Sequence, residues 1–185
     1  MKDQGANAKE KIFHAVFELL SSGENAQRLT SRQIAAKADV NLALVNYYYR
    51  SKENLLSEVV GKMMAEIIGP IMSNENDGAA SRLKDILTAT ADAAFAHENI
   101  CKIAISSELK NGCKSSCEMV LPLLKEILPS HSQQELDITA LQLMQPFHHI
   151  MLEPALYSAL LGTDFYNKQK REQKIAQMIS CAIAK

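Results

Sequence analysis

Apolar residues recur at intervals of three and four along almost the whole chain, and the longest such stripe constrains the fold class most. It comprises Leu55, Leu56, Val59, Val60, Met63, Met64, Ile67, Ile68 and Ile71. This spacing puts the side chains on one broad face of a helix, because a helix has about 3.6 residues per turn. The alternating Val, Ile and Thr runs that are typical of strands do not occur in the sequence. The sequence therefore predicts an all-α protein.

Capping residues and turn signals divide the pattern into separate helices. The predicted N-caps are Asn7, Thr30, Asn41 and Ser51, whose side-chain oxygens can accept from free N–H groups in the first turn. Gly23 is positioned to end the first helix. Later helices are expected at 79–97, 99–110, 114–128, 133–161 and 166–183, with a break in the 133–161 helix near Pro146 or Pro154.

Two of the early helices are short and are separated by a tight turn at residues 39–41. Ala35 and Ala38 are small enough to let these helices approach closely, and Val40 fills the corner of the turn. A longer helix followed by two such helices is the arrangement of a helix-turn-helix unit, whose last helix enters the DNA major groove. We therefore expect an N-terminal three-helix DNA-binding domain at residues 1–56.

Charge supports this expectation only weakly. The chain has a net charge of −1, 47% hydrophobic residues and 22% charged residues, which indicates an ordinary folded protein. Residues 1–56 hold eight Lys and Arg against six Asp and Glu, whereas residues 57–185 hold twelve against fifteen. The basic surplus lies in the N-terminal part, as expected for a DNA-binding domain, but it is small. The prediction of DNA binding therefore depends on the local sequence pattern.

The segment TSRQIAAKADV at 30–40, followed by NLALVNYYYRSKENLL at 41–56, resembles the signature of the TetR family. That pattern runs T-x-x-x-I-A-x-x-A-G-V, a short reader helix, an aromatic cluster ending in Phe, and then S-K-E-x-L-L. The resemblance covers about residues 8–60. The chain departs from the pattern at three positions. Asp39 replaces the usual Gly, Tyr49 replaces the usual Phe, and Asn46 stands where many members have a phosphate-contacting Tyr.

The resemblance implies a sequence-specific transcriptional regulator, a repressor released by a small-molecule effector, that binds a pseudo-palindromic operator duplex as a homodimer. The residues expected to contact DNA are Thr30, Ser31, Asn41, Leu42, Ala43, Leu44, Asn46, Tyr47, Tyr48 and Lys52. The expected reader helix contains no Arg or Lys, so Asn side chains would read adenine edges and Leu side chains would contact thymine methyl groups. Arg50 and Lys52 would supply charge for phosphates.

For residues 57–185, the resemblance implies a helical domain that binds the effector and forms the dimer. The candidate effector-lining residues are Phe95, Met119, Phe147, His148, Met151 and Tyr157, chosen as large apolar or amphipathic side chains; a plain core explains them equally well. The expected dimer face has one stripe of Leu141, Met144, Phe147, His148, Met151, Leu152, Ala155, Leu156, Ala159 and Leu160, and a second of Ile175, Met178, Ile179, Ala182 and Ile183. An internal core is the alternative interpretation of these stripes.

The sequence gives only weak signals for metal binding or redox chemistry. Adjacent His148 and His149 point about 100° apart on a helix, so we expect no metal site there with Glu153. Cys113 and Cys117 lie four residues apart, which leaves redox sensing or soft-metal binding open beside ordinary packing.

We expect no cofactor and no enzymatic activity, because phosphate-binding glycine loops and catalytic motifs are absent from the sequence. We also expect a cytoplasmic protein without a membrane partner. The alternative function is a helical protein-interaction module that does not bind DNA.

Overall fold

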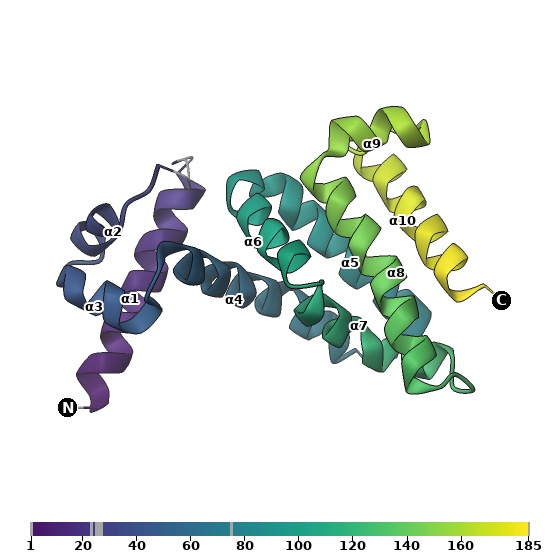
Figure 1. Cartoon of the computed structure of the whole chain (residues 1–185), viewed down its shortest axis with the longest axis horizontal. Helices are drawn as coiled ribbons and strands as arrows, with labels where there is room; N and C mark the ends of the chain where they lie inside the picture. The colour runs from purple at the N-terminus through teal and green to yellow at the C-terminus, as the bar shows by residue number, and fades with distance from the viewer. Residues whose placement is uncertain (1, 23, 25–27, 75, 185) are drawn as a thin grey trace. The chain divides into compact units, whose positions relative to one another are not determined.

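The computed structural model describes residues 2–22, 24, 28–74 and 76–184, and it consists of helices joined by turns (Figure 1). The helices are α1 (Lys2–Ser21), α2 (Ser31–Lys37), α3 (Leu42–Tyr49), α4 (Lys52–Met72), α5 (Ala79–Ala96), α6 (Glu98–Lys110), α7 (Lys114–Ile127), α8 (Gln133–Leu152), α9 (Pro154–Leu161) and α10 (Lys168–Ile183). Strands do not occur in the described ranges, so the predicted all-α class is confirmed. None of the described helices combines the length and apolar character needed to cross a membrane.

The chain divides into two compact units. Unit 1 holds residues 1–63 and 97–104, and unit 2 holds residues 64–96 and 105–185. The helix α4 therefore contributes its first turns to unit 1 and its last turns to unit 2. The predicted domain boundary between residues 56 and 57 falls earlier in α4 and stays a prediction.

In unit 1, α1, α2 and α3 pack against one another, as the turn signals predicted. The buried side chains follow the helical spacing and include Ile12, Val16, Leu20, Ile34, Val45, Leu55 and Val59. Fully burying one such aliphatic side chain contributes about 1.5–3 kcal/mol. This burial stabilises α2 and α3, which are too short to persist alone in water.

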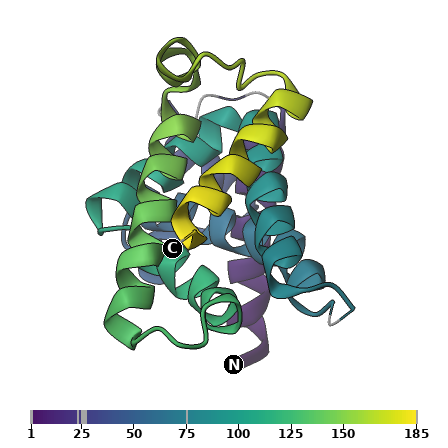
Figure 2. The ribbon, with the colours of Figure 1, turned by 90° about the vertical axis from the view of Figure 1, so that its right-hand side faces the viewer.

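In unit 2, α10 packs on α5 and α8, while α7 packs on the same two helices. Figure 2 shows α8 (green) and α10 (yellow) next to each other on the face turned toward the viewer. The core of this bundle includes Leu83, Leu87, Leu123, Leu124, Leu143, Phe147 and Phe165, all of which are almost fully buried.

The two prolines of the 133–161 segment behave differently. Pro146 lies inside α8, whereas Pro154 is the first residue of α9 and marks the break. Proline is favoured at this position because its missing N–H would have no helical partner anyway. At the other end of the chain, α1 begins at Lys2, so the prediction of Asn7 as an N-cap is wrong. Gly23, predicted to end this helix, lies outside the described residues.

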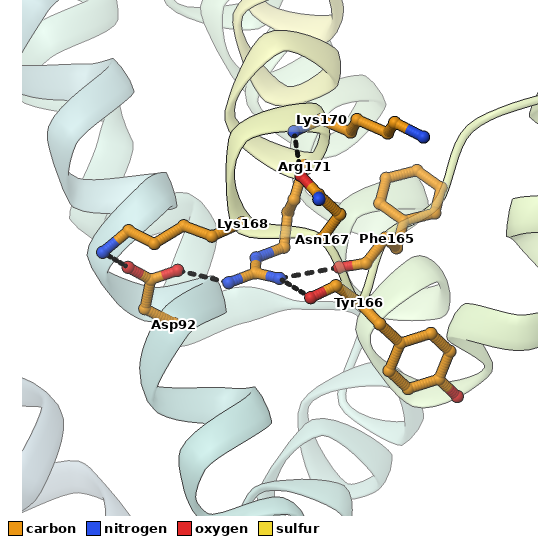
Figure 3. Close-up of polar contacts among 7 residues, drawn as sticks. All are labelled: Asp92, Phe165, Tyr166, Asn167, Lys168, Lys170 and Arg171. Atoms are coloured by element: carbon orange, nitrogen blue, oxygen red, sulfur yellow. Dashed lines mark hydrogen bonds and ion pairs between the residues drawn. The ribbon is translucent and has the colours of Figure 1, made fainter.

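A buried arginine ties the turn before α10 to α5 (Figure 3). The Arg171 side chain donates to Asp92 at 2.5 Å and to the backbone oxygen of Phe165 at 2.7 Å. Its guanidinium also lies 4.3 Å from the centroid of the Phe95 ring. Lys168 forms a second ion pair with Asp92 at 2.7 Å. Burial alone would raise the pKa of Asp92, but the hydrogen bonds and charges of Lys168 and Arg171 outweigh it and lower that pKa.

We predict that Arg171→Met lowers the free energy of unfolding by about 2–4 kcal/mol, because it leaves the buried Phe165 carbonyl without its partner and the half-buried Asp92 carboxylate with only the exposed Lys168. Urea denaturation at neutral pH measures this loss. Lys168→Met is the matched control, since the Lys168 side chain is 71% exposed and should contribute less than about 1 kcal/mol. Equal, small losses in both variants would show that Arg171 does not hold the turn.

Candidate nucleic-acid interface

The helix α3 has a buried face and an exposed face. Val45 and Tyr49, one turn apart, are buried in unit 1. Ala43, Asn46 and Tyr47 are exposed, and Tyr47 is the most accessible large apolar residue of the described chain, with 76% of its surface exposed. An amide and a phenol therefore stand in solvent next to a small alanine, a surface on which another molecule can approach the helix backbone closely.

The predicted cap of α3 is confirmed. Asn41 has extended backbone angles, and its Oδ1 accepts a hydrogen bond from the backbone N–H of Ala43 at 2.8 Å. This bond satisfies one of the free donors at the start of the helix. It also uses one of the two lone pairs of the side-chain oxygen with which Asn41 would read a base edge.

Tyr49 anchors the end of α3 to α1. Its hydroxyl donates to the backbone oxygen of Lys9 at 3.2 Å. The Lys9 ammonium pairs with Glu58 of α4 at 2.7 Å. Burial, and to a lesser degree the charge of Glu58, raises the pKa of Tyr49 to about 12. Tyr49 stands where the family pattern has Phe, and these contacts show what its additional hydroxyl does.

The turn between α2 and α3 explains a second departure. Asp39 has a φ of +52°, in the left-handed region. Glycine adopts this conformation without strain, whereas Asp tolerates it better than most other residues. The turn is closed by a hydrogen bond of 3.0 Å from the N–H of Val40 to the oxygen of Ala35.

The starts of α2 and α4 are capped as predicted. The Thr30 hydroxyl oxygen accepts from the N–H of Gln33, and the Gln33 side chain accepts from the N–H of Thr30 at 2.9 Å. Ser51 accepts from the N–H of Asn54 at 3.1 Å. The Thr30 hydroxyl also donates to the Gln33 side chain at 2.8 Å. A phosphate contact by this hydroxyl would have to replace that bond.

The structure places all ten predicted DNA-contact residues in unit 1, at the starts of α2 and α4 and along α3. Thr30, Asn41, Ala43, Asn46 and Tyr47 are exposed, whereas Ser31, Leu42, Leu44, Tyr48 and Lys52 are half-buried. The set is therefore brought together on packed helices. Its contact with DNA stays a prediction.

The predicted effector-lining residues are brought together only in part. Phe147, His148 and Met151 are buried on α8, and the Phe147 and His148 rings lie 5.9 Å apart. Phe95 contacts Tyr166 and Arg171 instead, with its ring 5.5 Å from the Tyr166 ring. Met119 on α7 and Tyr157 on α9 are half-buried. Their role in binding an effector stays a prediction.

His148 pairs with a cysteine 35 positions away, which no sequence signal indicated. The Cys113 Sγ lies 3.4 Å from Nδ1 of His148. Cys113 precedes α7 with a φ of +57°, and Glu108 accepts hydrogen bonds from the N–H and hydroxyl of Ser116 nearby. Burial lowers the pKa of His148 to about 4, so the imidazole is neutral at neutral pH.

Burial raises the pKa values of Cys101 and Cys117 to about 11 and also raises that of Cys113. These thiols are therefore held in the protonated form, which reacts poorly with oxidants and electrophiles. Among the described residues, no group of three or more His, Cys, Asp or Glu side chains is arranged to hold a metal ion.

Residues 21–59 match the sequence profile of the family described as bacterial regulatory proteins, tetR family. This segment contains α2, α3 and the first turns of α4. No curated protein matches the chain in sequence.

Solved structures resemble the chain over nearly its whole length. A TetR transcriptional regulator from Rhodococcus sp. RHA1 has 16% identity and a TM-score of 0.62, with 99% of this chain and 98% of that one covered. The fatty acid degradation regulator FadR from Bacillus halodurans has 13% identity and a TM-score of 0.60, with 96% and 95% covered. At these identities the likeness shows a shared fold.

We predict that acid destabilises the protein through His148. In the unfolded chain this imidazole titrates near 6.5, whereas in the folded chain its pKa is about 4. Between these pH values the unfolded state binds more protons, so stability falls as pH falls. The loss from pH 7.5 to pH 5 amounts to about 2 kcal/mol. Urea denaturation at both pH values should show that His148→Gln lacks this loss of unfolding free energy between pH 7.5 and pH 5.

His149→Gln serves as the control, because the His149 ring is half-exposed, hydrogen-bonds to the backbone oxygen of Gln145, and lowers the pKa of His148 less than burial does. It should retain most of the acid sensitivity of the wild type. The same pH dependence in the wild type and in His148→Gln would contradict the assignment to His148.

Proposed function

We propose that the chain is a transcriptional regulator whose residues 21–59, which match the tetR family of bacterial regulatory proteins, form its DNA-binding part, and that it binds a pseudo-palindromic operator as a homodimer. We further propose that it is a repressor released by an apolar small molecule bound in unit 2. The exposed face of α3 carries the DNA-binding proposal. Its exposed residues project from a short helix whose opposite face is fixed in the core of unit 1.

Phosphate contacts are proposed for the residues that flank this face. Thr30 and Ser31 begin α2, and Lys52 begins α4. Tyr47 and Tyr48, whose rings meet edge to face at 5.2 Å, offer hydroxyl donors. Such contacts fix the register of the protein on the duplex and supply affinity without sequence preference.

The homodimer is supported by apolar side chains that the single chain leaves in solvent. Ile138 and Leu141 on α8 and Leu156 and Leu160 on α9 are 40–71% exposed. Such a surface is typical of an interface. Part of the predicted dimer stripe has a different role, because Met144, Phe147, His148 and Met151 belong to the core of unit 2. The spacing alone could not separate the residues that face the core from those that face solvent, because the predicted dimer stripe is wider than one face of a helix.

The effector proposal is supported by the chain's connectivity. The helix α4 begins with the proposed DNA contact Lys52 and ends in unit 2, where Arg82 donates to the backbone oxygen of Met72 at 3.3 Å and pairs with Glu126 of α7 at 2.6 Å. A ligand that favours one arrangement of these helices would bias DNA affinity by that preference. An apolar ligand agrees with the name of the fatty acid degradation regulator that shares the fold.

Because its target would be chromosomal DNA, we place the protein in the cytoplasm, and the proposal involves no enzymatic step and no cofactor. A helical protein-interaction module without DNA binding remains the competing function. That function would leave the solvent-exposed Asn46 and Tyr47 of α3 without a role in DNA recognition.

We predict that the protein shifts duplex fragments from the promoter of its own or a neighbouring gene, with a Kd of about 10⁻⁸–10⁻¹¹ M at physiological salt. Electrophoretic mobility shifts at several salt concentrations measure both affinity and salt dependence. Lys52→Ala should weaken binding to all duplexes and flatten the salt dependence, because it removes a phosphate contact.

Leu141→Glu gives the control for the dimer. A charge on the exposed apolar face of α8 should yield a folded monomer. This monomer should bind a single half-site weakly and lose the preference for a palindromic site. If a folded, dimeric wild-type protein shifts no fragment at low salt, the protein-interaction module replaces the present proposal.

We predict that a long-chain fatty acid at a hundred times its Kd raises the free energy of unfolding by about 2.7 kcal/mol and releases the operator. Thermal denaturation with a series of chain lengths, followed by mobility shifts, measures both effects. A fatty acid that stabilises the fold but leaves operator affinity unchanged would contradict the coupling, while the assignment to DNA binding would stand.

A further inference from the structure

We infer that α3 reads A·T base pairs and that Asn46 is the side chain that recognises adenine. This inference rests on the proposed operator binding and adds the class of base pair that the reader helix prefers. It depends on which side chains the fold leaves available on α3, and on the hydrogen bonds that those side chains already make.

The packing of α3 selects the residues that can face a groove. Successive residues of a helix are 100° apart, so Ala43 and Tyr47 lie opposite the buried pair Val45 and Tyr49, whereas Asn46 lies beside the buried face, about 60° from Tyr49 and about 100° from Val45. All three residues are exposed. Asn46 is therefore accessible at the edge of the exposed face, and Ala43 leaves room on that face for a duplex to approach.

The two asparagines of this segment differ in their hydrogen bonds. Asn41 uses Oδ1 to cap the helix through the N–H of Ala43. The Asn46 side chain makes no hydrogen bond to any other described residue, and it is exposed. Adenine is recognised by an amide that accepts from N6 and donates to N7 at the same time. Asn46 has both groups available for this bidentate contact, whereas the Asn41 oxygen already accepts the capping bond, which holds its amide against the start of α3.

The remaining chemistry of α3 disfavours G·C pairs. Guanine is read mainly by Arg or Lys, and cytosine by a carboxylate. The helix sequence LALVNYYY contains none of these residues. Leu42 and Leu44 are half-exposed at its start, where apolar side chains can contact the methyl group of thymine. Amide and aliphatic groups together fit adenine and thymine.

Arginines stand close to α3 in sequence but outside it. Arg32 is exposed on α2, and Arg50 is exposed directly after α3 with a φ of +59°. We assign Arg32 to a phosphate, since the helix that precedes the reader helix crosses the DNA backbone, and Arg50 likewise, since it lies outside α3 and two residues before the proposed phosphate contact Lys52. Arg32 and Arg50 therefore provide a matched pair of control positions.

The test is selection of binding sites from a random duplex library by the full-length dimer, followed by affinity measurements on the selected site and on a shuffled duplex. We expect half-sites with adenine at one position that depends on Asn46. Asn46→Ala should weaken binding to the selected site roughly 5- to 150-fold, with little change on the shuffled duplex. Asn46→Arg should move the preference at that position toward guanine.

The control variants separate reading from support of the helix. Asn41→Ala should weaken both duplexes alike and be rescued by Asn41→Ser, because only the cap is lost. Arg32→Ala and Arg50→Ala should weaken both duplexes and leave the selected base unchanged. A G·C pair at the Asn46-dependent position, or a selected sequence unaffected by Asn46→Ala, would overturn the inference. Selection of no sequence at all by a folded dimer would instead overturn the proposed operator binding.

Discussion

The position of α3 depends on the burial of two side chains. A helix of two turns is not stable alone in water, so α3 keeps its shape because Val45 and Tyr49 pack into unit 1. The Tyr49 hydroxyl adds a directional contact to the backbone of α1, and the Lys9–Glu58 pair connects α1 to α4. The exposed residues of α3 are thus held on a rigid frame, which reduces the entropy lost when they bind another molecule.

The local features of this frame were predictable from the sequence. Caps at Thr30, Asn41 and Ser51 depend on residues within three positions of one another, so their signals lie in short segments. The break at Pro154 was one of two open alternatives, and the structure selects it because Pro146 is accommodated inside α8. The predicted start of α1 is wrong, since a plausible cap at Asn7 does not prevent the preceding residues from being helical.

Contacts between distant residues were not predictable. Asp92 and Arg171 are 79 positions apart, and Cys113 and His148 are 35 positions apart. Nothing in the spacing of apolar residues indicates which polar group a buried residue will meet. For the same reason, the broad stripe of residues 141–160 could not be divided into core and surface before the packing of α8 on α5, α7 and α10 was known. The candidate DNA face was accessible to sequence reasoning because it lies within residues 30–52.

Unit 1 is discontinuous in the chain, and this matters during synthesis. Its first part ends at residue 63, and its second part, residues 97–104, includes the buried Cys101. A ribosome adds roughly 5–20 residues per second, so the second part emerges roughly 2–8 seconds after the first. Until then, residues 1–63 lack the second part of unit 1. An N-terminal fragment cut within α4 would lack residues 97–104, even though it contains every residue proposed to touch DNA.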